Sequence, residues 1–494
     1  MTFESLLLFF IYTGHSPAGT HVQTRFTTTT SIAMSTQKNE IMPSAKGKMD
    51  LLNGPLFVKI LLFSLPLAMS SMLQQLFNSI DVAVVGHFVG SRALAAVGSN
   101  APVISLLINL FMGISMGANA ILSNHIGQND AERIRRSVST IGVLALVSGA
   151  ILLVTGVCIA RPILTWMDTP PEVLDMAVLY LRIYFLGMPF FMVFNFGSAI
   201  LRSMGDTRRP LYILVAAGIV NTLLNLFFVL VLHMGVEGVA IATGIANAVS
   251  AVIMVVLLMR EPGPFRLDVR HLRLDRRECT RMLQIGVPAG VQGMIFSISN
   301  VLVQSTINTY GASAVAGSSA AQNFEYYCYY IMTAFNGAAI TFIGQNYGAR
   351  RMDRVRRIFL ICMGMAVLTS GLANVCITWQ GDFFLSLFSP DPLVHQFGLE
   401  RMQTALVWQW LACSYEISGS SLRAMGRSLM PTLYTIFGTC VLRVIWVFAV
   451  CPIWPGFRIL MSVYPLSWVL TGSMVLTSFL IILHREMRSG LLQS

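Results

Sequence analysis

Long apolar segments are the feature of this sequence that most constrains its fold. Examples are Ile141–Ile159, Leu211–Leu232 and Val239–Met259, and each is close to the roughly 20 residues that a helix needs to cross a bilayer. Charged residues make up 11% of the chain, whereas a water-soluble domain carries about a quarter. The segments show little of the apolar–polar alternation that marks the strands of a membrane barrel. Because helices satisfy their backbone hydrogen bonds internally in lipid, the sequence predicts a multi-pass α-helical membrane protein.

The chain also contains an internal repeat, which is a strong guide to architecture. Three motifs occur twice, with the second copy 221 or 222 residues after the first: Leu201–Gly205 and Leu422–Gly426, Asn124–Arg136 and Gln345–Arg357, and Pro66 and Pro288. A chance resemblance between apolar sequences would not keep one spacing over such a distance. We therefore expect two homologous halves.

Each half contains six candidate membrane spans. They cover residues 56–84, 93–123, 137–160, 173–199, 210–232 and 238–260 in the first half, and 281–308, 313–344, 355–379, 396–420, 429–451 and 461–483 in the second. An even number per half makes both halves cross in the same direction, so the axis that relates them runs along the membrane normal. The predicted fold is an all-α membrane protein with 12 transmembrane helices in two homologous six-helix bundles, related by a pseudo-twofold axis along the membrane normal.

These spans divide the chain into five segments. They are a disordered N-terminal tail at 1–50, with the natural start at Met34, Met42 or Met49, lobes at 51–260 and 281–485, a cytoplasmic linker at 261–280 and a cytoplasmic tail at 486–494. Arginines concentrate in the loops after the even-numbered spans and in the linker. Since cytoplasmic loops carry an excess of Arg and Lys, we expect both termini in the cytoplasm, and the host membrane to be a bacterial cytoplasmic membrane.

Other functional classes lack their sequence signals. The formal charge of +11 comes from short clusters between apolar segments, which argues against nucleic-acid binding. None of the eight cysteines forms a C-x-x-C pair, so neither a metal site nor a disulfide framework is expected. No H-E-x-x-H, P-loop or nucleophile-elbow motif is found in a suitable context. We expect no cofactor and no enzyme activity, so uphill transport would depend on an ion gradient or on a partner.

Asp81 is the strongest candidate for a functional residue. An ionisable side chain inside a span costs roughly 2.5–3.5 kcal/mol to insert, which makes it a functional candidate. Gln74, Asn78 and Asp81 form one polar stripe on the first span, at positions i, i+4 and i+7. Such a stripe should face a wet cavity or another helix rather than lipid, and we expect Gln74 and Asn78 to line the substrate cavity. Because burial disfavours the charged form of a carboxylate, Asp81 could accept a proton or coordinate Na⁺, with no other metal expected. The alternative is a structural carboxylate that bonds to neighbouring helices.

Two further pairs of polar residues share a helix face. Asn221 and Asn225 lie one turn apart in the fifth span, where they would either help to bind a small cation or join helices by hydrogen bonds. Glu325 and Tyr329 lie one turn apart in the eighth span. They would either line a substrate cavity, where charge and cation–π attraction suit an organic cation, or belong to aromatic packing between helices.

Glu416, in the tenth span, is the last candidate for the substrate cavity. Its alternative role is an ion pair with an arginine such as Arg443, because a charge inside a span needs a partner. The sequence leaves both roles open.

By these residues, the sequence resembles the multidrug and toxic compound extrusion (MATE) transporters over roughly residues 53–484. The resemblance is carried by SLP and NSIDVAVVGHFVG in the first span, by the paired loops after the second and eighth spans, and by LRSMGDTRRP with its second copy LRAMGRSLMP. It implies two six-helix lobes that face a central cleft. It also implies a cation-coupling site in the N-terminal lobe at Asp81, Asn221, Asn225 and Thr243.

The sequence departs from the family pattern at two places. Some members carry a second acid where Asn225 stands. One branch of the family carries a glutamate shortly after the proline of the seventh span, where this chain reads Ser297–Asn300. The resemblance therefore implies that the N-terminal lobe alone handles the coupling ion.

We expect a secondary active multidrug efflux antiporter that exchanges H⁺ or Na⁺ for amphipathic, often cationic organic compounds by alternating access. Its partners would be these small compounds and the lipid bilayer, and the chain is expected to be a monomer. One alternative is a flippase for lipid-linked precursors, which usually has additional spans and a strongly cationic cleft. The others are an integral-membrane enzyme, which would need an acid–base or metal cluster at one membrane face, and a receptor or scaffold without transport.

Overall fold

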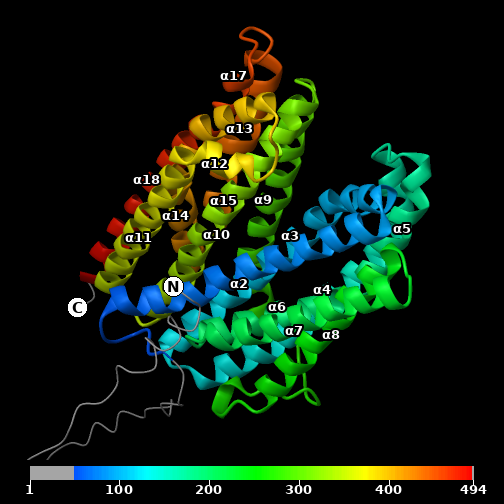
Figure 1. Ribbon diagram of the computed structural model, residues 1–494. Helices are drawn as coiled ribbons and strands as arrows, with labels where there is room; N and C mark the ends of the chain where they lie inside the picture. Colours follow the sequence, from blue (N-terminus) through cyan, green and yellow to red (C-terminus); the bar gives the residue numbers. More distant parts are fainter. Residues whose placement is uncertain (1–48, 492–494) are drawn as a thin grey trace, which may run out of the picture. The chain divides into compact units, whose positions relative to one another are not determined.

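The computed structural model describes residues 49–491, and this part of the chain is built from helices (Figure 1). No strand occurs between residues 49 and 491. The predicted tail at 1–50 lies outside the described residues apart from Met49 and Asp50, and so do two of the candidate starts, Met34 and Met42.

Six helical spans form the first half. They are α2 (Leu56–Val84) continued by the π-helical η1 (Val85–Val89), α3 (Ser91–Gln128), α4 (Ala131–Trp166), the pair α5 (Pro171–Leu186) and α6 (Met188–Ser203), α7 (Arg208–Leu226) continued by the π-helical η2 (Phe227–Val231), and α8 (Val236–Met259). Each overlaps one of the six predicted spans. The short η3 (Gly263–Phe265) lies in the linker that follows.

Six spans in the same order form the second half. They are α9 (Arg276–Asn308), α10 (Ala312–Gly348), α11 (Met352–Trp379), the series α13 (Pro392–Thr404), η4 (Leu406–Ala412) and α14 (Cys413–Ala424), the series α15 (Leu429–Thr435), η5 (Ile436–Val441), α16 (Leu442–Ile445) and η6 (Trp446–Val450), and the pair α17 (Phe457–Met461) and α18 (Val463–Leu491). The short α12 (Gly381–Ser386) precedes α13. The two sets of six confirm the predicted fold class.

The fourth span and its repeat, the tenth, are broken. The sequence predicts one continuous helix for each, at 173–199 and at 396–420, and this detail of the prediction is wrong. Helices α5 and α6 meet at Gly187 with a bend of 45°. Pro189 in the first turn of α6 has no N–H to complete the helical ladder, which explains the break. In the tenth span the chain tightens into the 3₁₀ winding η4 instead.

Within the described residues, nine helices are long and apolar enough to cross a membrane, and the bent pair α5–α6 makes a tenth. The two other predicted spans, α10 and the series α13–η4–α14, are more polar. They contact each other and carry five acidic or arginine side chains: Glu325, Glu400, Arg401, Glu416 and Arg423. Much of the interior charge of the second half therefore lies in these two neighbouring spans, with Arg443 in α16 as a separate buried charge.

Each half has its own buried apolar core, and α2 takes part in the packing of both halves. The beginning of α2, with Ile60 and Phe63, is buried in the core of the second half, where the Phe63 ring lies 5.3 Å from the ring of Phe342 on α10. The rest of α2 packs against α7 in the first half. One continuous helix therefore connects the two bundles.

The most extensive contact between the halves is the crossing of α3 and α9, where glycines lie on both helices. A Cβ atom on Gly113 would lie 2.2 Å from the backbone nitrogen of Gly290, and one on Gly117 would lie 2.7 Å from the backbone nitrogen of Gly286. Spacing glycines four residues apart allows two helix backbones to approach closely in a membrane. At this crossing, backbone packs directly against backbone.

We predict that Gly113→Ala destabilises the protein, because its methyl group would overlap the backbone of α9. Overpacking of this kind costs about 1–3 kcal/mol, and the thermal unfolding of the purified protein in detergent measures it. Gly98→Ala on the same helix is the matched control, since a Cβ there meets nothing within 4 Å. An unfolding temperature for Gly113→Ala equal to that of the control would show that the crossing tolerates a side chain.

The repeated motifs contact each other across the two halves. Asn124 Nδ2 donates to the carbonyl of Ala424 at 2.8 Å, and its repeat partner Gln345 donates through Nε2 to the carbonyl of Ser203 at 2.7 Å. Ser203 and Ala424 are themselves repeat partners, so each half donates one bond and accepts its equivalent. We call this reciprocal pair of hydrogen bonds the clasp.

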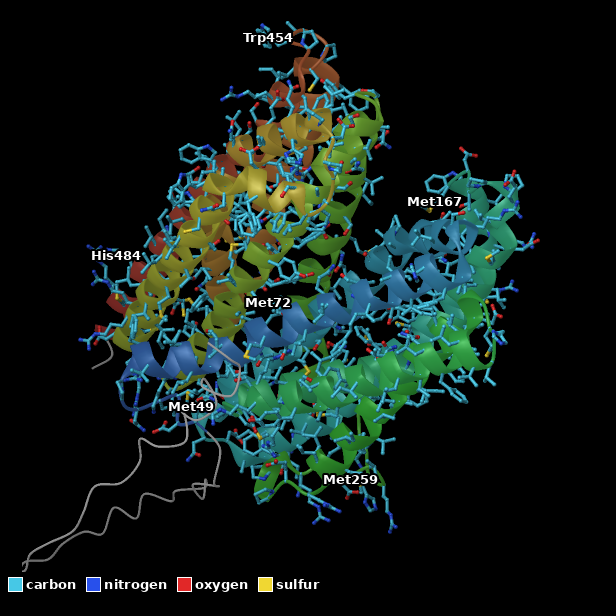
Figure 2. All side chains as sticks on the ribbon, in the orientation of Figure 1. Met49, Met72, Met167, Met259, Trp454 and His484 are labelled. Atoms are coloured by element: carbon cyan, nitrogen blue, oxygen red, sulfur yellow. The ribbon has the colours of Figure 1, made fainter. Side chains whose placement is uncertain are left out.

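Two repeated glycines bring the helices together at the clasp. A Cβ on Gly127 would lie 1.9 Å from the carbonyl oxygen of Gln345, and one on Gly348 would lie 2.1 Å from that of Asn124. The clasp lies at the helix ends where most of the arginines gather, in the loops 129–130, 204–207, 260–275, 349–351 and 425–428 and in the helix turns next to them, and we call this side the arginine-rich face. Met259 and His484 lie toward this side of the helices and Trp454 toward the opposite one (Figure 2).

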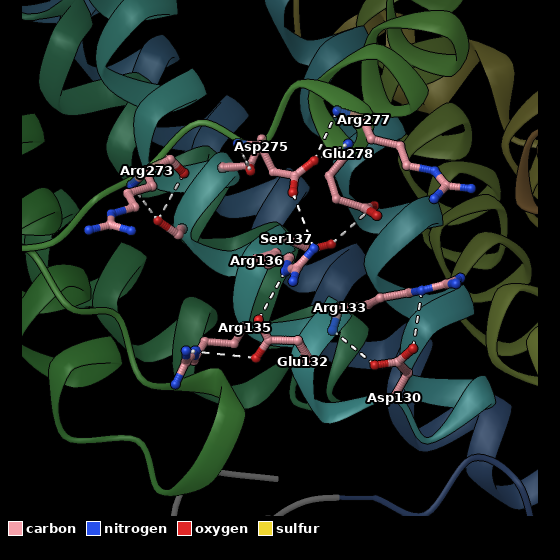
Figure 3. Close-up of polar contacts among 12 residues, drawn as sticks. Asp130, Glu132, Arg133, Arg135, Arg136, Ser137, Arg273, Asp275, Arg277 and Glu278 are labelled. Atoms are coloured by element: carbon pink, nitrogen blue, oxygen red, sulfur yellow. Dashed lines mark hydrogen bonds and ion pairs between the residues drawn. The ribbon is translucent and has the colours of Figure 1, made fainter.

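The linker packs against α4 on the same face (Figure 3). Asp275 caps α9 by accepting from the backbone N–H groups of Arg277 and Glu278, and its own backbone N–H donates to Thr140 Oγ1 at 3.1 Å. The backbone N–H of Arg273 donates to Ser139 Oγ at 2.7 Å. The bonds to Thr140 and Ser139 attach the start of the second half to the first half.

Candidate functional site

Asp81 lies in a ring of polar side chains inside the first half, formed by α2, α7 and α8. Its Oδ1 accepts from Asn225 Nδ2 at 2.5 Å, and its Oδ2 lies 3.4 Å from Thr243 Oγ1. Asn225 Nδ2 also lies 3.3 Å from Asn221 Oδ1, and Asn221 Nδ2 lies 3.3 Å from Thr243 Oγ1. The four residues that the resemblance implies for the cation site are therefore in mutual contact.

The hydroxyl of Thr243 is shared unequally within this ring. It lies 3.0 Å from the carbonyl oxygen of Val239, one turn earlier on α8, and 3.4 Å from Asp81. A hydroxyl has one proton to donate, and the shorter contact is the stronger bond. The firm hydrogen bond to Asp81 is therefore the one from Asn225.

The ring binds the carboxylate through neutral groups. Asp81 is half-buried, whereas Asn221 and Asn225 are buried. Among the described residues, no Arg, Lys or His forms an ion pair with Asp81, and Asn225 Oδ1 has no hydrogen-bond partner. A carboxylate without a basic partner in membrane surroundings can be neutralised by a proton, and a set of oxygen atoms of this kind suits a small hard cation.

Two features near the ring were not anticipated from the sequence. Tyr180 and Tyr184, on α5, stack with ring centroids 6.0 Å apart and lie within electrostatic range of Asp81. Their spacing of one helical turn was the available signal. In addition, Asp81 and Asn225 each lie just before a π-helical turn, η1 and η2 respectively, and such turns are frequent at functional sites.

Gln74 and Asn78 do not join the ring. Both are exposed on α2 and are not among the hydrogen-bond partners of Asp81. The adjacent Gln75, which the sequence analysis did not consider, accepts through Oε1 from the hydroxyl of Tyr330 on α10 at 2.9 Å. That bond links α2 to the second half.

Glu325 has an ionic partner that the sequence analysis did not name. Its Oε1 and Oε2 accept from Arg401 Nε at 2.7 Å and Nη2 at 2.8 Å, and both residues are buried. A third donor of Arg401, Nη1, reaches Ser318 Oγ at 2.7 Å. The charge of this carboxylate is therefore compensated within the protein. Arg401 falls inside the predicted span 396–420, and a charge at membrane depth was a signal for such a pair.

Glu416 does not pair with Arg443, which was one of its two expected roles. Its Oε2 accepts from Asn336 Nδ2 at 2.7 Å, and Arg423 and Tyr329 lie within electrostatic range. Arg443 instead donates from Nη1 to Asn300 Oδ1 at 2.6 Å. Glu416 and Tyr329 thus lie close together in the second half, on α14 and α10, while Glu325 is directed to Arg401.

We predict that Glu325→Gln strongly destabilises the protein. Removing one partner of a buried ion pair leaves an uncompensated charge and costs about 3–5 kcal/mol. The double variant Glu325→Gln/Arg401→Gln should recover most of that loss, because neither side chain is then charged.

Thermal unfolding in detergent compares these variants with Asp382→Asn, a control acid whose side chain is 81% exposed. The control should unfold at the wild-type temperature. If the single and double variants were equally unstable, the ion pair would not account for the effect of the substitution.

Two repeated six-helix bundles, with a half-buried carboxylate held by neutral groups among the membrane spans, define a two-lobed membrane transport protein. Comparison with known proteins gives the family. A model of the MatE family matches residues 66–227 and 288–448, well over half of the chain, and the second match begins 222 residues after the first (288 against 66). The chain belongs to this family, the MATE transporters.

Curated relatives and solved structures agree with this assignment. The chain is 28% identical over 386 residues to the "Probable multidrug resistance protein YoeA" of Bacillus subtilis, which covers 76% of this chain and 83% of the relative. It is 25% identical over 358 residues to the "FAD transporter" of Shewanella oneidensis, covering 71% and 78%.

A solved structure described as the "Outward-facing conformation of a multidrug resistance MATE family transporter of the MOP superfamily" superposes with a TM-score of 0.83 at 22% identity. The superposition covers 90% of this chain and 100% of the chain in the solved structure. At this identity, the likeness establishes the fold.

Proposed function

We propose that this protein is a secondary active efflux transporter that exports small amphipathic organic compounds in exchange for H⁺ or Na⁺, with Asp81 as the coupling group. The observation that supports this most is the ring around Asp81, in which a carboxylate among membrane spans has only neutral partners. Membership of the MATE family and the printed names of relatives such as the multidrug resistance protein of Bacillus subtilis support export of organic compounds.

Helix α2 provides a route from ion binding to the opposite half. Asp81 lies near one end of α2, and the other end is buried in the core of the second half. Neutralising Asp81 removes the charge that the amide of Asn225 stabilises, which favours repacking of α2 against α7 next to their π-helical turns. Coupling requires only that the ion and the exported compound prefer different states of the protein.

The clasp is the contact that such a change would open. With the arginine-rich face in the cytoplasm of a bacterium, as its charge suggests, the described conformation is closed on the cytoplasmic side by the two reciprocal hydrogen bonds. Uptake from the cytoplasm requires these bonds to break. One charge that moves through 100 mV supplies about 2.3 kcal/mol, which supports roughly a fifty-fold gradient of the exported compound.

The structure also limits the proposal that the cargo is cationic. That expectation rested on Glu325 and Glu416, and the charge of Glu325 is compensated by Arg401. Glu416 is half-buried, lies near Tyr329 and accepts its hydrogen bond from the neutral amide of Asn336. We therefore propose amphipathic compounds in general as cargo, with Glu416 rather than Glu325 as the acidic contact.

We predict that Asp81→Asn abolishes coupled efflux, because an amide can neither take up a proton nor carry the charge that binds Na⁺. Dye efflux from whole cells should fall at least tenfold (about 1.4 kcal/mol), with the H⁺ and Na⁺ gradients collapsed separately to identify the ion. Asp175→Asn, whose side chain is 83% exposed, is the control and should retain efflux. Efflux by Asp81→Asn at the wild-type rate and expression level would remove Asp81 from the mechanism.

We also predict that Gly348→Val weakens the clasp, because its side chain would overlap the carbonyl of Asn124. The protein should shift toward states open at the arginine-rich face, seen as faster amide hydrogen exchange at the ends of α3 and α10. Gly364→Val on α11 is the control, since a Cβ there meets nothing within 4 Å. Unchanged exchange would mean that the clasp does not limit opening.

A further inference from the structure

Arg443, in α16, is a buried charge whose guanidinium is only partly satisfied. The side chain is 0% exposed, and Nη1 donates to Asn300 Oδ1 at 2.6 Å. The two faces of the guanidinium are covered, since Cζ lies 4.9 Å from the ring centroid of Phe296 and 4.6 Å from that of Tyr464. Among the described residues, Nε and Nη2 have no hydrogen-bond partner.

In the same half, Arg401 shows what the Nε and Nη2 donors of a guanidinium bind together. Its Nε and Nη2 hold the two carboxylate oxygens of Glu325, which is the bidentate geometry that an arginine fork favours. Tyr464 lies beside both arginines, 5.4 Å from Cζ of Arg401. Arg443 presents the same pair of donors, but no Asp or Glu of the described residues forms an ion pair with it. A buried charge of this kind is costly unless a counter-ion joins it.

The internal repeat places Arg443 among the helices that correspond to those of the Asp81 ring, one position from the counterpart of Asn221. At the spacing of 221 or 222 residues, the positions correspond as follows: Arg443 to Thr222, Tyr464 to Thr243, and Asn300 to Asn78. The helices that form the ring in the first half, α2, α7 and α8, therefore match the helices around Arg443. The first half has an acid without a basic partner at this place, and the second half has a base without an acidic partner.

The helix windings agree with this correspondence. In residues 49–491, π-helical turns occur only in the spans of these two centres. In the first half η1 follows Asp81 and η2 follows Asn225, and in the second half η5 and η6 flank Arg443 on both sides. π-helical turns are rare in proteins overall, and those that occur often lie at functional sites.

We propose that Arg443 binds a compact anionic group, either free chloride or a carboxylate, as the charge-reversed counterpart of the Asp81 ring. Nε and Nη2 donate to the anion, Phe296 and Tyr464 hold the plane of the guanidinium, and Asn300 fixes its far side. Phe296 and Asn300 are half-buried on α9, so an anion would approach Arg443 along that helix. This binding is independent of the proposed coupling at Asp81.

The test is anion-dependent stability of the full chain, purified in detergent. Chloride or acetate is titrated against isethionate at constant pH and ionic strength, and unfolding is followed by tryptophan fluorescence on heating. A ligand that binds only the folded protein raises the unfolding temperature with the logarithm of its concentration, here by on the order of 1–2 °C per tenfold increase. The wild type should show this rise and Arg443→Gln should not. Arg458→Gln, which removes an exposed arginine, is the control and should respond like the wild type.

Two further variants separate the possible outcomes. Arg443→Lys keeps the charge but loses the fork, so its affinity for acetate should fall at least tenfold, and by more than its affinity for chloride. Asp81→Asn should keep the full anion response even though we expect its efflux to fail, which distinguishes this site from the proposed function.

The source of the anion follows from the wild-type titrations. If acetate and benzoate bind at least tenfold more tightly than chloride, the ligand is a carboxylate, as a transported compound would supply. If chloride binds equally or more tightly, the ligand is a free halide. The proposal is overturned if the wild type responds to neither anion, or if a folded Arg443→Gln or Arg443→Met keeps the response.

Discussion

The backbone of α3 lies directly against the backbone of α9, and glycines on both helices leave no room there for side chains. In a membrane there is no hydrophobic force to drive helices together, so the association of two bundles depends on close packing and on interhelical hydrogen bonds. The α3–α9 crossing provides the close packing, and the clasp provides two hydrogen bonds at one end of it. The rest of each bundle can then keep its own core and its own interior charges.

The interior charges of the two halves are arranged differently. The first half holds Asp81 among neutral donors, while the second half holds the buried pair of Glu325 with Arg401 and a separate Arg443. The two halves share their helix order, so this difference in charge lies in the side chains at equivalent positions. In this internal repeat the order of the helices is the same in both copies, whereas the buried charged side chains differ.

Much of the fold could be predicted from the sequence, because long apolar segments and a fixed repeat spacing are local or periodic signals. The twelve spans, the two halves and the four residues around Asp81 were all named in advance, although Thr243 and the grouping of the four into one site came only from resemblance to the MATE family. The partner of Glu325 was not named, because Arg401 lies 76 residues away along the chain and periodicity says nothing about which helices are neighbours. A polar stripe such as that of Gln74, Asn78 and Asp81 has a related limit, since it does not reveal which of its members faces a neighbouring helix.

The breaks in the fourth and tenth spans show where local signals fail. Pro189 marks the first break, but the tenth span has no proline between residues 393 and 424, and its 3₁₀ winding depends on packing. The sequence also gave no sign that the repeated motifs contact each other, although both copies of each motif were recognised. Repetition showed that the motif matters, and only the three-dimensional arrangement showed that its two copies bind each other.

In the clasp, each half gives a side-chain donor to the backbone of the other and receives the equivalent donor in return. This is the pattern of an isologous interface, the kind that two identical subunits form around a twofold axis. A protein of half this length could therefore make the same contact with a second copy of itself. Within one chain the interiors of the two copies differ, while the surface at which they meet has the reciprocal form of a homodimer.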